Sequence, residues 1–115
     1  MEKLKKCTPY HFGAPLALLV CYDDARSWKR SFDAQDSGFV DASIVTTHLM
    51  MAAWEQGVGS TWVMYFDPEK MRAEFALPEH MVPVALLPLG YPGESAKPSP
   101  SHASFRPEED LVSYL

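Results

Sequence analysis

Apolar side chains recur along residues 41–56 with the period of a helix. Val45, Leu49, Ala52 and Ala53 form one stripe of a 3.6-residue repeat. Further apolar residues lie outside this stripe, namely Ile44, Met50, Met51 and Trp54. We therefore expect a long helix that is covered on more than one side. Gly57 is suited to a left-handed position after the helix, and Gly59 would allow a close approach of backbone.

Three apolar runs of strand length are predicted to form a sheet: residues 15–22, 61–66 and 83–89. The first run is continuous, which is typical of a strand buried on both faces. Asp67 followed by Pro68 predicts the start of a short helix that ends before Pro78. Residues 23–38 read as a polar loop, with Asp36, Ser37 or Asp41 as helix caps. Strands alternating with helices favour an α/β or α+β sandwich.

The two ends of the chain differ from this middle part. Residues 1–14 form a lysine-rich stub that ends in the breakers Pro9 and Gly13, and residues 93–107 hold several prolines and serines. Residues 108–115 resume an apolar pattern that suits a short strand or helix docking elsewhere. We expect one domain over residues 1–115, with the stub at 1–14 and an extended arm at 93–115.

Composition narrows the function classes. With 47% hydrophobic residues the chain can bury a core, and its net charge of −5 disfavours nucleic acid as a partner. No apolar run approaches the roughly 20 residues needed to span a bilayer. No apolar signal-peptide segment follows the lysines, so a cytoplasmic protein is expected. Cys7 and Cys21 fit free buried thiols better than a disulfide or a metal site.

Candidate chemistry is sparse. The four histidines are scattered without metal-ligand spacing, so no metal site is predicted. His48 lies on the long helix, about 10 Å along it from Asp41, and a structural role outweighs a catalytic one. Trp62 and Tyr65 follow the glycine turn, an arrangement that suits a flat apolar ligand but also a plain core strand.

Several short motifs together resemble the nitroreductase family of FMN-dependent oxidoreductases. They are residues 41–48, Ala52-Ala53, residues 57–60, Trp62-Val63, residues 66–68, Leu77-Pro78 and residues 87–92, with Ala14-Pro15 before them and residues 110–112 after them. Their order and spacing hold from about residue 10 to the C-terminus. The resemblance covers only the C-terminal part of a family member.

This resemblance implies a nitroreductase-like α+β fold, truncated at the N-terminus, with a long central helix packed on a small sheet. It also implies a homodimer with FMN at the subunit interface, and reduction of nitroaromatic, quinone or similar acceptors by NAD(P)H. Because the chemistry passes through the flavin, no side chain is nominated as acid, base or nucleophile.

The resemblance also suggests which residues bind the cofactor. The stretch that lies against the flavin ring in the family corresponds to Trp62, Val63, Met64 and Tyr65. A basic residue that reaches the phosphate in the family corresponds to Phe105, which leaves Arg106 as the nearest candidate and Lys97 and His102 as weaker ones.

Two family segments are missing from this sequence: the arginine- and serine-rich motif that binds the phosphate, and a Pro/Asn segment that contacts the flavin. Each lost charge-assisted bond removes roughly 1.5–3 kcal/mol of binding. The alternative hypothesis is therefore a truncated, non-catalytic fragment, or one part of a split protein, that no longer binds FMN well. A third is an interaction module that uses its apolar helix.

Overall fold

The last strand of the chain is the central strand of a three-stranded antiparallel sheet. The computed structural model describes residues 1–115 and orders the strands as β1 (Leu16–Asp23), β3 (Met81–Gly90) and β2 (Gly59–Ser60). The β1–β3 pairing runs from Leu16 opposite Leu89 to Asp23 opposite Met81. β3 is buried along most of its length, whereas the edge strand β1 is only half-buried and not buried on both faces as predicted.

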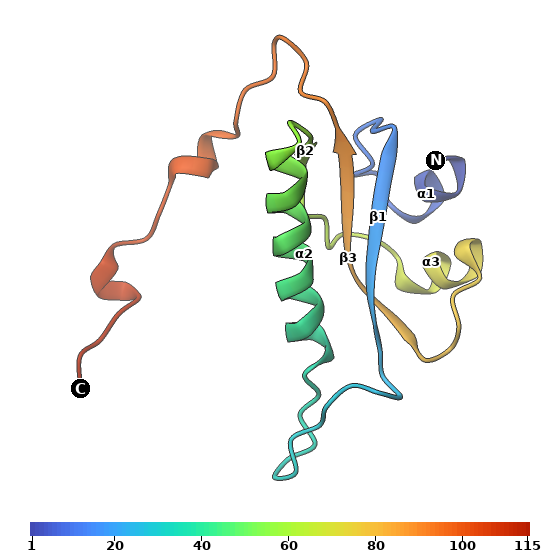
Figure 1. The fold of residues 1–115 in the computed structure, drawn as a ribbon, viewed down its shortest axis with the longest axis vertical. Coiled ribbons are helices and arrows are strands. Elements are labelled where there is room, and N and C mark those ends of the chain that lie inside the picture. The colour runs from blue at the N-terminus through green and yellow to red at the C-terminus, as the bar shows by residue number, and fades with distance from the viewer.

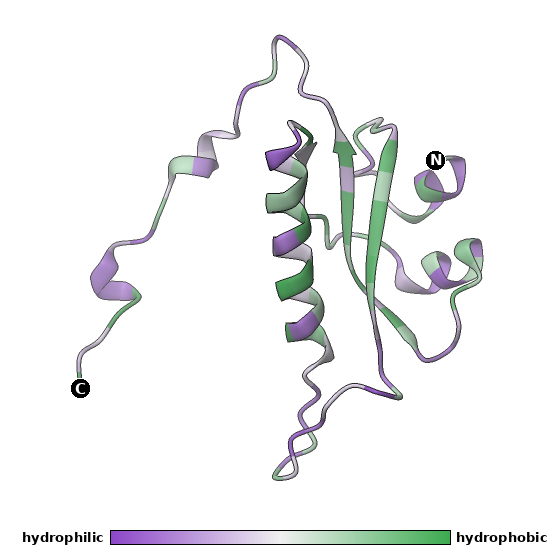
Figure 2. Ribbon diagram, viewed as in Figure 1, coloured by the Kyte–Doolittle hydropathy of each residue, from purple (hydrophilic) through white to green (hydrophobic).

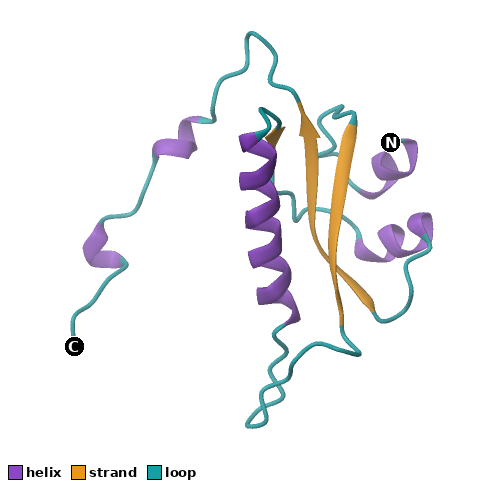
Figure 3. Ribbon diagram, viewed as in Figure 1, coloured by secondary structure: helices purple, strands orange, loops and turns teal.

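Helices cover both faces of this sheet (Figure 1). The long helix α2 (Gly38–Glu55) lies on one face, and the short helices α1 (Glu2–Cys7) and α3 (Pro68–Phe75) lie on the other (Figure 3). The buried cluster on the α2 side is Val20, Ala42, Val84 and Ala85, and that on the other side is Leu4, Cys7, Val63, Met71 and Leu86. The predicted α+β fold, with a long helix on a small sheet, is confirmed.

α2 packs on the sheet through small residues. Only Gly38, Ala42 and Thr46 are buried, and the Thr46 hydroxyl donates to the Ala42 carbonyl at 2.7 Å. The prediction that this helix is covered on more than one side is therefore wrong for the single chain, and two members of the predicted stripe, Val45 and Ala52, are exposed. The exposed large apolar residues, here called the outer face of α2, are Phe39, Val40, Ile44, Val45, Met51 and Trp54. Apolar colour accordingly recurs along α2 in Figure 2.

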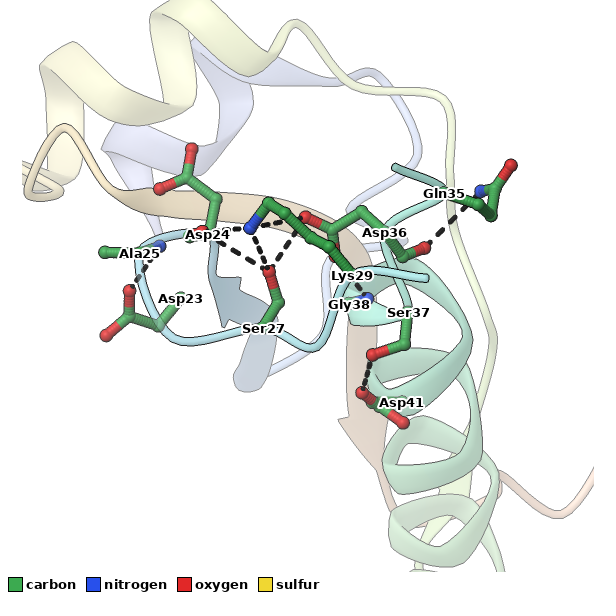
Figure 4. A network of polar contacts seen from close by, with 10 residues as sticks. All are labelled: Asp23, Asp24, Ala25, Ser27, Lys29, Gln35, Asp36, Ser37, Gly38 and Asp41. Carbon is green, nitrogen blue, oxygen red and sulfur yellow. Dashed lines mark hydrogen bonds and ion pairs between the residues drawn. The ribbon is translucent and has the colours of Figure 1, made fainter. Parts of the chain in front are cut away.

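A polar network holds the loop that leads into α2 (Figure 4). The Asp36 carboxylate accepts from the Gly38 N–H at 2.7 Å and from the Ser27 hydroxyl at 2.8 Å, and pairs with Lys29 at 3.3 Å. Hydrogen bonds from Gly38 and Ser27 hold the pKa of Asp36 below its usual value. Among the three predicted caps, Asp36 is thus the residue bonded to the first N–H of the helix.

The second predicted strand is much shorter than expected. Residues 61–66 were expected to pair fully, but β2 is Gly59–Ser60, followed by a single bridge between Val63 and Leu86. The Thr61 N–H donates to the Pro88 carbonyl at 3.3 Å, and Pro88 has no N–H to return to Thr61. This missing bond interrupts the ladder between β2 and the bridge.

The end of α2 and the start of α3 lie where they were predicted, whereas α2 begins at Gly38, before the predicted residue 41, and the predicted stub contains the helix α1. The Asp67 carboxylate accepts from the N–H groups of Glu69 at 3.1 Å and Lys70 at 3.0 Å, which confirms it as the N-cap of α3. Gly57 has φ +73°, which confirms the left-handed residue after α2.

Residues 93–115 leave the body of the molecule as extended chain (Figure 1). This arm holds only two short 3₁₀ turns, Pro100–Ala103 and Glu108–Asp110, and its apolar end, residues 111–115, is exposed instead of docked. Cys7 is buried and Cys21 half-buried, and both are free thiols. No helix has the length and hydrophobicity required to cross a membrane.

Candidate functional site

The segment predicted to face a flavin ring, residues 62–65, lies at the edge of the sheet and is fixed by hydrogen bonds at both ends. At one end Val63 exchanges two backbone hydrogen bonds with Leu86, each of 2.9 Å. At the other end the Asp67 N–H donates to the Cys7 carbonyl at 2.9 Å, which ties the segment to the end of α1. Residues 64–66 between these anchors are in neither a helix nor a strand.

The four predicted ring contacts point in different directions. The Trp62 side chain packs against the cluster under α2, and its Nε1–H is buried without an acceptor. The Val63 side chain is 5% exposed in the opposite cluster, so only its backbone is near the surface. Met64 and Tyr65 are 57% and 71% exposed. The structure therefore leaves two of the four side chains, Met64 and Tyr65, open to a ligand.

In the backbone of Met64 and Tyr65, both carbonyl groups are hydrogen-bonded and both N–H groups are not. The Met64 carbonyl accepts from the Phe66 N–H at 3.0 Å, and the Tyr65 carbonyl accepts from the Thr8 hydroxyl at 2.6 Å. Neither the Met64 N–H nor the Tyr65 N–H donates to another group of the chain. Two N–H donors without a partner in the chain fit the edge of a flavin ring, which carries nitrogen and carbonyl acceptors.

A groove of about 1260 Å³ lies next to this segment, between the C-terminal half of α2, the residues just before β1, the end of β3 and the arm. Met51 and Trp54 line it from α2, and Lys97 and His102 line it from the arm. It includes residues 59–61 but none of the predicted ring contacts, and Arg106 does not line it. The structure thus brings the two weaker phosphate candidates, and not Arg106, to the groove.

Arg106 and the other basic side chains lie elsewhere. Arg106 is exposed on the arm. Lys5 and Lys6 are on α1, across the sheet from α2, where they pair with Glu2 at 2.6 Å and Glu74 at 2.8 Å. His48 is exposed on α2.

Aromatic residues just before β1 lie against Tyr65, and none of them was predicted as a site residue from the sequence. Tyr10 packs edge-on against Tyr65, with ring centroids 5.4 Å apart and an interplanar angle of 86°. The ring centroid of Phe12 lies 6.1 Å from that of Tyr10, and Phe12 also lines the groove. The cluster of exposed aromatic residues in the stretch Thr8–Phe12 was the only available sequence signal.

Comparisons with known proteins agree with this geometry. The family model described as "Nitroreductase family" matches residues 3–91. A relative from Methanothermobacter thermautotrophicus, named as an NADH dehydrogenase/NAD(P)H nitroreductase, is 32% identical over 102 residues, covering 83% of this chain and 51% of its own length. The chain therefore spans about half the length of that curated relative.

Solved structures show the same fold. A nitroreductase family protein from Clostridium difficile 630 is 40% identical with a TM-score of 0.88, over 98% of this chain and 66% of that one. A nitroreductase from Exiguobacterium sibiricum, solved in complex with FMN, is 22% identical with a TM-score of 0.60, over 69% of this chain and 36% of that one. On the extent of the family match and the shared fold, the chain belongs to the nitroreductase family.

Proposed function

We propose that this chain acts as an FMN-dependent NAD(P)H oxidoreductase that reduces nitroaromatic, quinone or similar acceptors. The observation that carries the proposal is the pair of N–H donors of Met64 and Tyr65, two exposed residues, that have no partner in the chain. They lie in the stretch that resembles the flavin-ring segment of the family. When bound, FMN supplies two-electron hydride transfer between NAD(P)H and the acceptor.

In this proposal the protein orients the ring and excludes water. Met64 and Tyr65 donate backbone hydrogen bonds to the ring edge, and the exposed side chains of both residues cover part of the ring. The buried side chains of Trp62 and Val63 act by anchoring the segment on both sides of the sheet. No side chain of the chain is assigned a proton-transfer step.

The cofactor phosphate would be held by cations of the arm. Arg106 is the candidate from the family resemblance, and Lys97 and His102 are supported by their position on the groove wall. A guanidinium can hold a phosphate through two parallel hydrogen bonds, which favours Arg106 if the arm folds over the ring segment.

The outer face of α2 supports a homodimer, in which a second copy of the chain covers this face. Six large apolar side chains are exposed along one 18-residue helix, and contiguous apolar surface of this kind is typical of interfaces. The groove beside α2 is then closed by the second subunit, which would place the ring segment near the interface. A cytoplasmic location is proposed on the two free thiols.

A non-catalytic dimerising module is the second candidate. The same outer face of α2 supports it, because self-association through this face does not require a cofactor. The position of Arg106 outside the groove also favours it, since FMN retention depends on charge-assisted bonds to the phosphate.

An absorbance spectrum of the purified full chain, before and after addition of FMN, separates these candidates. The enzyme proposal expects flavin absorbance that remains after gel filtration, and NADH- or NADPH-dependent reduction of a quinone. A chain that is dimeric but binds no FMN on titration would be the dimerising module instead. Riboflavin is the matched ligand control, because it has the same ring and no phosphate.

A further inference from the structure

We propose that Thr8 is a positioning residue that holds Tyr10 and Tyr65 together, and that these two rings, with Phe12, form a platform that stacks a planar aromatic ring with hydrogen-bond acceptors on its edge. The choice of ligand rests on the proposed function. The residues themselves are assigned from contacts that do not depend on it.

The Thr8 hydroxyl links the two tyrosine residues through hydrogen bonds. It is 2% exposed, donates to the Tyr65 carbonyl at 2.6 Å and accepts from the Tyr10 N–H at 3.0 Å. One side chain therefore fixes the backbone of two residues that are 55 positions apart in the sequence. A buried hydroxyl whose donor and acceptor are both used sets the geometry of the groups that it joins.

The three aromatic residues around this hydroxyl are partly exposed. Tyr10 is 47% exposed, Phe12 is 63% exposed, and Tyr65 makes its ring contact edge-on, which leaves ring faces free. Phe12 has φ +53°, a left-handed conformation that is uncommon for a non-glycine residue. The turn that holds it is closed by the Ala14 N–H donating to the His11 carbonyl at 3.0 Å. Such strain is often kept at binding sites.

The chemistry of the neighbouring backbone selects the kind of ligand. A purely apolar partner could cover the rings, but it would leave the N–H groups of Met64 and Tyr65 without acceptors. A planar heteroaromatic or quinonoid ring satisfies both requirements, since its face stacks on aromatic side chains and its edge carries acceptors. The flavin ring and the ring of the second substrate share this chemistry.

The test uses the full chain and lumiflavin, which has the flavin ring without a phosphate, in parallel with FMN and menadione. Flavin fluorescence and absorbance report ring binding. Tyr10→Leu and Tyr65→Leu should each raise the lumiflavin Kd about tenfold, the scale of one lost stacking contact. Tyr114→Leu is the matched control, because Tyr114 is an exposed tyrosine on the arm outside the groove.

Thr8 is tested by a pair of variants. Thr8→Val removes both hydrogen bonds with little change of shape and should weaken ring binding about tenfold. Thr8→Ser keeps the hydroxyl and should bind the ring as the unchanged chain does. A purely structural role predicts lower stability in Thr8→Val with no change in the Kd for the ring. The Kd values for lumiflavin and FMN should rise by the same factor, because the lost contact concerns the ring.

The outcomes are distinguishable. A rise in flavin Kd identifies the cofactor ring as the ligand, and an unchanged flavin Kd with a raised KM for menadione identifies the acceptor. Tyr10-dependent ring binding without oxidoreductase activity would overturn the proposed function and keep the platform. FMN binding that is equal in the Tyr10→Leu and Tyr114→Leu variants, with equal KM values, would overturn the platform alone. Absence of any ring binding, or Tyr10-dependent self-association in its place, would also overturn the platform.

Discussion

Gly38, at the start of α2, lies directly against the ring of Tyr22 on β1. A Cβ atom at Gly38 would overlap the Cδ2 and Cε2 atoms of that ring. Tyr22 also belongs to the apolar residues packed on the cluster under α2. The distance between the long helix and the sheet is therefore set by the absence of a side chain at residue 38.

Gly38→Ala should destabilise the fold by about 1–3 kcal/mol, the usual cost of overpacking, even though alanine favours helix. Chemical denaturation of the variant measures this loss. Gly93→Ala is the control, because a Cβ at Gly93 would meet no atom within 4 Å. A second substitution, Tyr22→Leu, should recover part of the loss, and no recovery would contradict this explanation.

Acid should weaken the start of α3. The Lys70 N–H bonded to the Asp67 carboxylate, followed by the charge of Lys70, holds the pKa of Asp67 below its usual 3.8. The unfolded chain therefore binds the proton more readily, so this stabilisation is present above pH 3.8 and is lost as pH falls through the lower pKa of the folded state. Thermal unfolding between pH 5 and pH 2 checks the sign.

Asp67→Asn is the matched variant for this experiment, because asparagine can still cap the helix but does not titrate in this range. Its Tm should fall less steeply with acid than that of the unchanged chain. Asp67→Ala should lower the Tm at neutral pH by losing the cap. Equal acid dependence in Asp67→Asn and the unchanged chain would assign the effect to other carboxylates, such as Asp36.

The outer face of α2 should control self-association. Ile44→Glu and Val45→Glu place a carboxylate on exposed positions of this face and should shift a dimer towards monomer by at least tenfold in Kd, because a charge is costly to bury. Sedimentation velocity across a concentration series measures the shift. Ala73→Glu makes the same change on the exposed surface of α3, across the sheet, and should leave association unchanged.

Arg106 should matter for the phosphate and not for the ring. Arg106→Gln is expected to raise the Kd for FMN about tenfold, the effect of one charge-assisted bond, and to leave the Kd for riboflavin unchanged. Lys97→Gln tests the alternative cation on the groove wall. If Lys97→Gln has the larger effect, the phosphate lies in the groove beside α2 and not along the later part of the arm.

The sequence predicted local structure well wherever one residue type has one physical role. Asp67 capped its helix and Gly57 adopted a left-handed conformation, since side-chain length and the lack of a Cβ decide these positions locally. The length of β2 could not be predicted in this way. It depends on Pro88, which faces Thr61 only after the chain has folded back through α3.

The candidate site was predicted in part for the same reason. The position of residues 62–65 follows from their place after the glycine turn in the sequence. The direction of each side chain depends instead on which face of the sheet it packs against. Thr8 and Tyr10 were not identified, because their role arises from a contact with Tyr65 across most of the chain. Helical periodicity likewise identified α2 but not its buried face, because packing on the sheet favoured the small residues Gly38 and Ala42.

The occupied carbonyls and free N–H groups of Met64 and Tyr65 bear on turnover as well as on binding. A surface with two free donors, and with one lone pair of each carbonyl already used, favours the oxidation state of a quinone that presents more acceptors. The oxidised form presents carbonyl oxygens that accept, whereas the reduced form presents hydroxyl groups that need acceptors. The Thr8 hydroxyl, by engaging the Tyr65 carbonyl, would then favour release of the reduced product.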